Sequence, residues 1–554
     1  MTVAWHRARE PLLVLAIAVF TGFLSTSQRW AGLDTPDSSF YASLGLFGHD
    51  VTDRAPIDSY YWTRLGYIAP VRLLTEITGV WPGFTIYRFL LVLMLCAGIY
   101  IVVRRFTGIP SAIFLTTIAS LSSVILSYLG NSYLTGSVLA GTSVLIACAM
   151  FDGRRAALIA GVTLGWLVMV NPVGVLLAGT IWLALRIQAR GRLITYAIAA
   201  AATIVTFAVF WVIGRLMFPT LDWFGTYLGA NDRIDYSNFA SKEPVWLGDI
   251  SLIVPVAVLI AVFVAWVTHR SEVAAQRALV ISLSSIGFML VFNPMLGGIP
   301  LEGPFYQAML WPPAMIALVL VTTLAMPERR WTRLQTGAGI LAVVVVIAAG
   351  HVTPGVSLLL GWIIGLTAVA VFLLGSYKGT IGAIASLALL LAVAQFLQNS
   401  RGDLGLYYLS PYNWAFSANP ISDRIHTAVN TQEWLLDRTT NDDQILSWVG
   451  GNWVGGDREL YVVAGMMLWG ENRVTLEPVV TPDDATRLDE IRPTAIAMYA
   501  PTMDQVLQFW SSIPTANRAT APECYDFPWT PNPASAFPIS QGHACLTRLT
   551  WDAA

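Results

Sequence analysis

The sequence predicts a polytopic α-helical membrane protein with a C-terminal α/β domain. Of its 554 residues, 55% are hydrophobic and only 12% are charged, whereas soluble domains usually carry about a quarter charged residues. Apolar runs of about 17–25 residues recur between residues 9 and 397, and each is long enough to cross a hydrocarbon core of roughly 30 Å. Such runs must be helices, because backbone groups in lipid have to pair within their own segment.

The apolar runs place about thirteen spanning helices in a transmembrane bundle over residues 1–397. They are expected at 9–27, 84–103, 109–128, 133–151, 155–171, 173–189, 194–217, 249–268, 274–293, 306–326, 335–350, 355–375 and 379–397. The basic N-terminus MTVAWHRARE is followed by no small-residue cleavage pattern, which favours an uncleaved signal anchor.

Basic residues mark one side of this bundle. They occupy alternate connections: Arg7, Arg9, Arg104, Arg105, Arg154, Arg155, Arg186, Arg190, Arg192, Arg270, Arg277, Arg329, Arg330, Arg333 and Lys378. The positive-inside rule then makes the N-terminus cytoplasmic. The loops at 28–83 and 218–249 and the domain at 398–554 are expected outside a plasma (inner) membrane, unless two helices merge around Asn171-Pro172.

The C-terminal segment reads as alternating strands and helices. DDQILSWVG, PTAIAMYA and GHACLTRLTW are expected strands, RVTLEP is a short extended piece, and ISDRIHTAVNTQEWLLDRT, RELYVVAGMMLW and MDQVLQFWSSI are expected helices. This alternation favours an open, mostly parallel sheet. No glycine-rich phosphate loop opens any of these helices, which argues against a nucleotide site. Trp448, Trp453 and Trp469 are either stacking platforms for a glycan or core residues.

Cysteine usage agrees with an external C-terminal domain. Cys524 and Cys545 are the only cysteines there, and we expect a disulfide between them because the outer face is an oxidising compartment. Two unpaired thiols are the alternative. Cys96 and Cys148 fall inside predicted helices and are expected to be buried and inert.

The polar stretch Ala31–Arg72 directly follows the first apolar run and gathers carboxylates and arginines. Asp34 and Asp58 fit structural roles in a turn and at a helix N-terminus. Asp37 instead begins DSSFYASLGLFG, whose apolar residues have helical spacing, so that an interfacial helix is expected there.

The pattern Asp37-Ser38-x-x-Tyr41, in the first external loop after a basic N-terminus and one helix, resembles the class C glycosyltransferases. That superfamily includes protein O-mannosyltransferases, the lipid A aminoarabinose transferase and actinobacterial envelope arabinosyl- and mannosyltransferases. The segment ILSWVGGNWVGGDRELYVVAG also resembles the tails of bacterial members. Many members carry Asp-Glu or Glu-Asp where this chain has Asp37-Ser38.

The resemblance implies transfer of a sugar from a polyprenyl-phosphate donor to a hydroxyl of an envelope glycan, lipid or protein, hence a role in cell wall biogenesis. This chemistry needs a carboxylate to accept the hydroxyl proton. Asp37 is the first candidate for that base, and Asp50 and Asp53 are the next. The sugar, the acceptor and the stereochemistry stay open.

Positive charge must stabilise the leaving phosphate, and a guanidinium can hold phosphate with two hydrogen bonds. Arg64 is the first candidate, with a snorkelling arginine as the structural alternative. The other candidate cations are Arg54, Arg72, Arg233 and Lys242. Further substrate contacts are expected from Tyr41, His49, Tyr60 and Tyr61, and His49, Asp50 and Asp53 are also candidate ligands for a divalent cation.

Other functions fit the sequence less well. The net charge of −2 gives no basic field for nucleic acid. A transporter or flippase of a lipid-linked sugar would place ionisable groups near the bilayer midplane, often in repeated halves, and neither is found. An acyltransferase would need a membrane-embedded histidine, which His269 and His351 do not supply. An assembly scaffold stays open.

Overall fold

The computed structural model describes residues 2–25, 41, 44–45, 59–120, 125, 129, 134–226, 250–295, 304–325, 434–435, 437–440, 442–450, 488, 492–514, 517–527 and 542–551. The chain divides into two compact units. One comprises Met1–Arg29, Thr85–Ile213 and Tyr227–Ala415, and the other Trp30–Phe84, Gly214–Thr226 and Phe416–Ala554. The predicted helices at 335–350, 355–375 and 379–397 lie outside the described residues, so the total of about thirteen remains a prediction.

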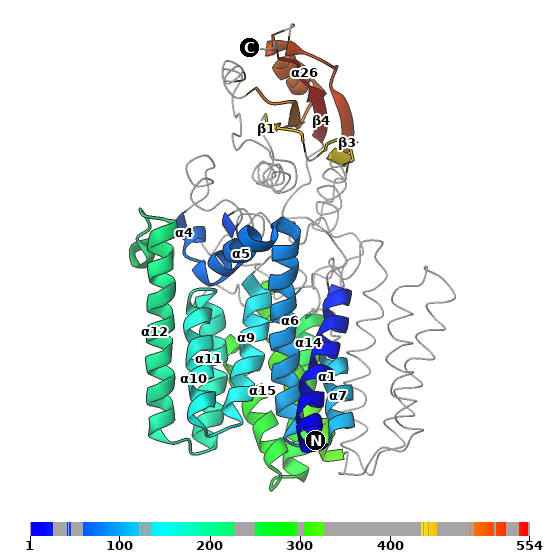
Figure 1. Cartoon of the computed structure of the whole chain (residues 1–554). Helices are drawn as coiled ribbons and strands as arrows, with labels where there is room; N and C mark the ends of the chain where they lie inside the picture. Colours follow the sequence, from blue (N-terminus) through cyan, green and yellow to red (C-terminus); the bar gives the residue numbers. More distant parts are fainter. Residues whose placement is uncertain are drawn as a thin grey trace, which may run out of the picture. The chain divides into compact units, whose positions relative to one another are not determined.

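The first unit is a bundle of apolar helices that run side by side (Figure 1). The helices that lie in it wholly or largely are α1 (Thr2–Ser25), α6 (Val80–Arg104), α7 (Ile109–Ser120), α9 (Leu134–Ala149), α10 (Arg154–Val168), α11 (Pro172–Gln188), α12 (Leu193–Met217), α14 (Ile250–Thr268), α15 (Val273–Met295), α17 (Pro304–Ala308) and α18 (Trp311–Ala325). The segment expected as a helix at 306–326 is interrupted by a turn at Met309–Leu310, between α17 and α18, and prolines occupy the first turn of α18. Proline suits that position because its missing N–H would have no helical partner there.

Within the described residues, four helical segments are long and apolar enough to cross a membrane: Pro82–Arg104, Leu193–Met217, Val273–Asn293 and Tyr306–Leu324. Five shorter apolar helices accompany them, at Glu10–Gly22, Ile109–Ser120, Leu134–Ala149, Pro172–Gln188 and Pro255–Thr268. The chain is thus a multi-pass helical membrane protein.

Burial separates a central helix from a peripheral one. Of the residues in the apolar stretch of Tyr306–Leu324, 94% are buried, whereas only 17% are buried in that of Leu193–Met217. α18 packs against α9, α14 and α15. Large apolar side chains of α12, such as Ile204 and Leu216, are exposed, as expected for a surface that faces lipid.

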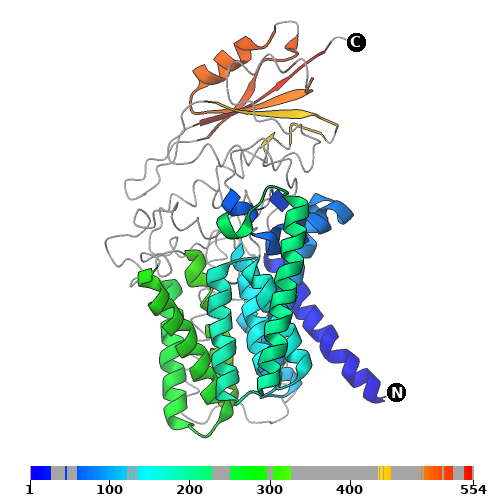
Figure 2. The ribbon, with the colours of Figure 1, turned by 90° about the vertical axis from the view of Figure 1, so that its left-hand side faces the viewer.

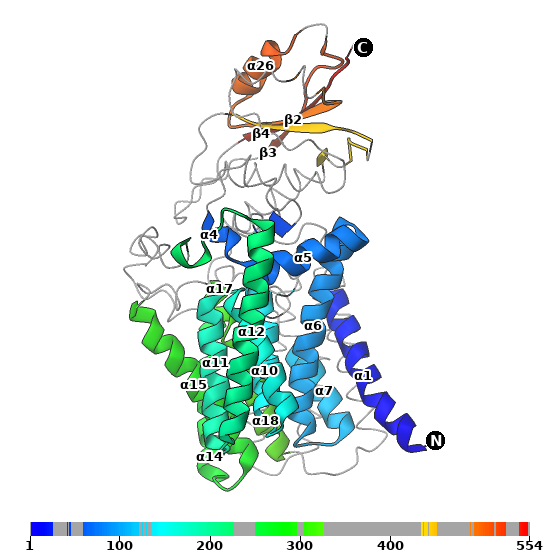
Figure 3. The same cartoon turned by 60° about the vertical axis from the view of Figure 1, so that its left-hand side comes forward.

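α10 and α12 approach closely at a glycine, as small residues allow in membranes. A Cβ built on Gly161 would lie 2.3 Å from the carbonyl oxygen of Ala199. The Thr203 hydroxyl also donates a hydrogen bond to the Gly161 carbonyl, at 3.1 Å. Figure 3 shows the two helices next to each other in the bundle.

α10 and α11 are separate helices, which answers the question of a merger around Asn171. The Asn171 side chain accepts a hydrogen bond from the Gly174 N–H at 3.1 Å, and Pro172 is the first helical residue. Both features are typical of a helix N-terminus. The pair Asn171-Pro172 therefore serves helix initiation.

In the second unit, the first polar loop contains α4 (Ser59–Trp62) and α5 (Leu65–Thr78). α5 buries Leu65, Tyr67, Ile68 and Val71, while Leu73 and Ile77 are exposed. The expected interfacial helix that starts at Asp37, and the turn and cap residues Asp34 and Asp58, lie outside the described residues.

The C-terminal part of this unit is a four-stranded mixed sheet. Its strands are β1 (Ile445–Val449), β2 (Ala495–Ala500), β3 (Glu523–Phe527) and β4 (Gly542–Arg548), in the order β1-β2-β4-β3. β1 and β2 are parallel, while β4 is antiparallel to both β2 and β3. The expectation of a mostly parallel sheet is therefore wrong for the described strands, because two of their three pairings are antiparallel.

α26 (Met503–Ser512) lies on one face of the sheet (orange in Figure 2). The core between them contains Trp448, Met498, Val506 and Phe509. The rings of Trp448 and Phe509 stack with centroids 4.3 Å apart. Trp448 is therefore a core residue and not a glycan platform.

The other expectations for the C-terminal domain are divided. Strands at DDQILSWVG, PTAIAMYA and GHACLTRLTW and the helix at MDQVLQFWSSI are confirmed as β1, β2, β4 and α26. The expected helix at 458–469, the extended piece at 473–478 and both Trp453 and Trp469 lie outside the described residues. So does the expected helix at 421–439, apart from its last residues.

Candidate functional site

The described part of the first polar loop is organised around a break between α4 and α5. The Thr63 and Arg64 amides donate to the carbonyls of Tyr60 and Tyr61 at 3.2 Å, and the Thr63 hydroxyl donates to Tyr60 at 2.6 Å. These bonds close α4 in a turn. Arg64 then stands at the N-terminal boundary of α5, with φ −83° and ψ 44°. The break therefore places an arginine at the junction of two short helices.

Arg64 is buried, with only 4% of its surface exposed. Its Nη2 donates a hydrogen bond to the Tyr60 hydroxyl. Its guanidinium carbon also lies 4.4 Å from the centroid of the Tyr60 ring, within the range of a cation–π interaction. A snorkelling arginine would extend its charged end into water, whereas this side chain is held inside the loop.

Tyr60, the partner of Arg64, belongs to a cluster of four tyrosine rings. Tyr41 lies 5.4 Å from Tyr61 and 6.3 Å from Tyr67 between ring centroids, and Tyr60 lies 5.8 Å from Tyr61. Tyr41 and Tyr67 are buried, and Tyr60 and Tyr61 are half-buried. The structure thus brings Tyr41, Tyr60 and Tyr61 into one cluster, which Arg64 joins through Tyr60. Their contact with a substrate stays a prediction.

Tyr67 is a member of this tyrosine cluster that the sequence analysis missed. It lies three residues after Arg64, and helical neighbours at that spacing share a face. That spacing was the available signal, but YIAPVR was read only as part of the loop.

The break packs against the last turn of α12 and the residues that follow it, and the sequence analysis missed this contact. The indole Nε1 of Trp223 donates to the Thr63 carbonyl at 3.0 Å. The Trp62 ring stacks on Phe218 with centroids 5.5 Å apart. Leu65 packs so closely on Gly214 that a Cβ there would lie 2.2 Å from it. No short-range pattern joins these residues, which are more than 140 positions apart in the chain.

Arg72 stands apart from Arg64. Its Nε forms an ion pair with Glu76 Oε1 at 2.5 Å, one helical turn further along α5. Eight residues of α-helix separate Arg72 from Arg64 by about 12 Å along the axis. The contact of Arg72 with the donor phosphate stays a prediction.

The remaining candidates of the loops lie outside the described residues: Asp37, His49, Asp50, Asp53, Arg54, Arg233 and Lys242. Among the residues that are described, no group of three or more His, Cys, Asp or Glu side chains could hold a metal ion. The proposed cation ligands His49, Asp50 and Asp53 accordingly stay a prediction.

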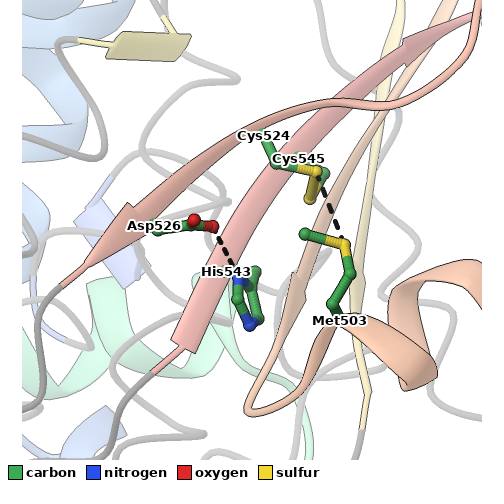
Figure 4. Close-up of a disulfide and its surroundings, with 5 residues drawn as sticks. All are labelled: Met503, Cys524, Asp526, His543 and Cys545. Atoms are coloured by element: carbon green, nitrogen blue, oxygen red, sulfur yellow. Dashed lines mark hydrogen bonds and ion pairs between the residues drawn. A yellow bond between two sulfur atoms is a disulfide. The ribbon is translucent and has the colours of Figure 1, made fainter.

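The expected disulfide is confirmed. Cys524 of β3 and Cys545 of β4 stand directly opposite each other and are bonded (Figure 4). The Met503 sulfur of α26 lies 3.9 Å from the Cys524 sulfur, and His543 Nδ1 lies 2.6 Å from Asp526 Oδ1 two cross-strand pairs further along. The bond fastens edge strand β3 to the sheet. Cys96 and Cys148 are buried free thiols, as expected.

A multi-pass helical bundle, short helices in the loop after the first helix and a C-terminal mixed sheet make up the described part of the fold. No protein-family model matches the sequence, and no curated protein matches it. The likeness is to solved structures.

The chain is structurally similar over nearly its whole length to ArnT from Cupriavidus metallidurans bound to undecaprenyl phosphate. The match has a TM-score of 0.53 at 13% identity and covers 97% of both chains. ArnT in the apo state matches with a TM-score of 0.48 at 14% identity, over 98% of both chains. The arabinosyltransferase EmbB from Mycobacterium smegmatis matches with a TM-score of 0.39 at 16% identity, over 69% of this chain and 40% of that one.

Proposed function

We propose that this protein transfers a sugar from a polyprenyl-phosphate donor to an acceptor hydroxyl at the outer face of the membrane. The observation that supports the proposal is the burial of Arg64 against Tyr60, which itself belongs to a cluster of four tyrosines, in a chain whose fold is similar to that of ArnT bound to undecaprenyl phosphate. Acceptors of this class would be hydroxyls of an envelope glycan, lipid or protein.

Arg64 is the residue that we assign to the donor phosphate. A guanidinium presents paired N–H groups that match the geometry of phosphate oxygens. The hydrogen bond and the ring contact with Tyr60 fix its position before a ligand arrives. Such a preorganised cation stabilises the charge that collects on the phosphate as the sugar leaves.

The acceptor hydroxyl must lose its proton as its oxygen bonds to the anomeric carbon. The bond between that carbon and the phosphate oxygen breaks, and its electron pair stays on the polyprenyl phosphate. We assign the proton to a carboxylate of the first loop, with Asp37 as the first candidate and Asp50 and Asp53 as the next. Arg54, Arg233 and Lys242 are additional candidates for phosphate contacts.

The orientation follows from charge and cysteine chemistry. The connections at one end of the bundle carry the arginines, which the positive-inside rule places in the cytoplasm. The Cys524–Cys545 disulfide suits an oxidising compartment. We therefore place the first loop and the C-terminal domain outside the cytoplasm and the chain in the plasma (inner) membrane.

The proposal is tested by donor binding and transfer in the variant Arg64→Lys. Lysine keeps the charge but loses the paired N–H groups, so we expect donor affinity and transfer to fall at least about tenfold. The control is Arg438→Lys in the C-terminal domain, whose ion pair with Glu523 is partly exposed and which we expect to bind the donor normally. Equal donor affinity and equal transfer in the two variants would show that Arg64 does not bind the donor phosphate. Movement of the lipid-linked sugar across a liposome membrane without transfer would favour a flippase.

A further inference from the structure

Four arginines converge on the short connection between α9 and α10, residues 149–153. Arg105 follows α6, Arg186 belongs to α11, Arg192 precedes α12 and Arg277 belongs to α15. α6, α9 and α11 end near this connection, and α10, α12 and α15 begin near it. The cluster therefore occupies one end of the helical bundle, where the lipid headgroups of one leaflet are expected.

Arg186 is the structural centre of this arginine cluster. It is only 3% exposed, and its Nη1 donates to the Phe151 carbonyl at 2.8 Å. Its Nη2 pairs with Asp152 Oδ1 and donates to the Thr195 hydroxyl at 3.0 Å. Arg186 therefore has a structural role, because it supplies hydrogen-bond donors to the Phe151 carbonyl, just after the end of α9, and to the Asp152 carboxylate.

The Asp152 carboxylate is shared with a second arginine, since Arg192 Nε lies 3.5 Å from Asp152 Oδ2. The hydrogen bond from Arg186 lowers the pKa of Asp152 below its ordinary value, so this carboxylate stays ionised near neutral pH. One negative charge thus faces two arginines.

Arg105 and Arg277 complete the cluster without a carboxylate of their own. The Arg105 guanidinium carbon lies 5.2 Å from the centroid of the Phe151 ring. Arg277 Nη1 donates to the Met150 sulfur at 3.0 Å and to the Ala149 carbonyl at 3.4 Å. Thioether sulfur is a weak acceptor, and the carbonyl contact is long. Within the described residues, neither guanidinium has an acidic partner within 4.0 Å.

Four arginines and the Asp152 carboxylate leave the arginine cluster itself with an excess of three positive charges. Like charges held together by packing repel one another unless an anion joins them, and the repulsion is larger where water is scarce. Phospholipid phosphates lie at this depth of a bilayer, and arginine binds phosphate with paired hydrogen bonds.

We propose that Arg105 and Arg277 bind the phosphate of an anionic phospholipid beside the α9–α10 connection. Asp152, Arg186 and Arg192 hold the connection in place, while the other two guanidinium groups direct N–H donors to the lipid. The site lies in the first compact unit and does not depend on the proposed transfer reaction.

The test is lipid binding by the purified full-length protein in a neutral detergent. Phosphatidylglycerol, phosphatidylcholine and inorganic phosphate are titrated against the wild type, and the shift in Tm and the Kd are measured. We expect phosphatidylglycerol to bind and to raise the Tm, while phosphatidylcholine does not. The double variant Arg105→Gln/Arg277→Gln is expected to weaken phosphatidylglycerol binding at least about tenfold, the loss of roughly one charge-assisted contact.

The matched control is Arg154→Gln/Arg155→Gln. These two arginines are exposed in the first turn of α10, and their removal lowers the net charge by the same amount, so binding should change less than about twofold. An equal loss in both double variants would mean a diffuse charge effect and would overturn the site. Displacement of the lipid by millimolar inorganic phosphate would assign the site to a free anion instead. The variant Arg105→Lys/Arg277→Lys checks folding, because it keeps both charges and should keep the wild-type Tm without lipid.

Discussion

Trp223 donates its indole N–H to the carbonyl of Thr63 at 3.0 Å, and this hydrogen bond joins the residues after α12 to the break between α4 and α5. Both side chains are buried. Arg64 is the next residue after Thr63, so the position of its guanidinium depends on a contact 160 residues away in the chain. The described residues at the α4–α5 break and those at the end of α12 therefore pack as one unit.

The variant Trp223→Phe keeps the ring but removes the donor, which leaves the buried Thr63 carbonyl unpaired. We expect a loss of about 1–3 kcal/mol in the free energy of unfolding and a KM for the donor that rises more than kcat falls. Thermal unfolding and steady-state kinetics measure the two effects. Trp211→Phe, on a partly exposed position of α12, is the control. An unchanged KM would show that the contact does not position Arg64.

The variant Tyr60→Phe removes the hydrogen-bond acceptor of Arg64 and keeps the ring under its guanidinium. A hydrogen bond to a charged group contributes about 1.5–3 kcal/mol, so donor affinity should fall roughly ten- to a hundredfold, as a titration with polyprenyl phosphate would show. Tyr196→Phe, whose ring packs on Trp182, should bind as the wild type does. Wild-type affinity in Tyr60→Phe would contradict the assigned role of this hydroxyl.

The variant Gly161→Ala tests the close approach of α10 and α12. The added methyl group would meet the Ala199 carbonyl at 2.3 Å, so the helices must separate, at a cost of about 1–3 kcal/mol. A lower Tm in detergent is expected. Gly153→Ala is the matched control, because nothing lies within 4 Å of a Cβ at Gly153. Equal Tm values for the two variants would disprove the close packing.

The disulfide closes a segment with a sequence separation of 21 residues. Removing a bond that closes a loop of this size costs about 3 kcal/mol in the chain-entropy account. Reduction, or the variant Cys524→Ala/Cys545→Ala, should expose β3 to proteolysis, whereas Cys96→Ala should not. Thiol labelling of protein from intact cells also checks the compartment, and free thiols at both positions would contradict an external C-terminal domain.

The ionised carboxylate of Asp443 stabilises the C-terminal sheet, so we expect the stability of the sheet to fall in acid. Burial raises the pKa of this carboxyl, but hydrogen bonds from the Thr440 amide, Arg548 and Thr494 outweigh burial and lower the pKa below its ordinary 3.8. Because the folded pKa is the lower one, the stabilisation is present above pH 3.8 and is lost as the pH falls through the folded value.

The variant Asp443→Asn should therefore be less stable than the wild type at neutral pH, by about 1.5–3 kcal/mol for the lost charged hydrogen bonds. The difference should shrink below pH 3.8. Pulsed hydrogen exchange of β2 (Ala495–Ala500) after incubation at each pH measures it. A difference that persists unchanged at low pH would refute the role of the ionised carboxylate.

Periodicity and composition predicted the described membrane helices closely, because a bilayer leaves a long apolar segment no alternative to a helix. Periodicity and composition did not predict the positions where a turn interrupts a helix. SYYWTRLGYI has the composition of a single helix, and the turn at Thr63 depends on the indole of Trp223. The same holds at Met309–Leu310, where an apolar run of spanning length hides the boundary between α17 and α18.

The sheet was predicted in part. Buried strands such as AIAMYA are recognisable by their apolar residues, whereas β3, ECYDF, is short and half polar. It belongs to the sheet because it pairs with β4 and is bonded to it through Cys524 and Cys545. The tyrosine cluster could likewise not be predicted from the sequence, because Tyr41 and Tyr67 come together through tertiary packing.

The measurement that tests the central claim most directly is sugar transfer by the purified wild type and by Asp37→Asn. Radiolabelled polyprenyl-phosphate sugars are the donors, and donor binding is measured in parallel. We predict that the wild type transfers label to an envelope acceptor, and that Asp37→Asn binds the donor but loses transfer. Transfer that survives in Asp37→Asn would move the base to Asp50 or Asp53. A well-folded wild type that transfers no sugar from any polyprenyl-phosphate donor would contradict the account.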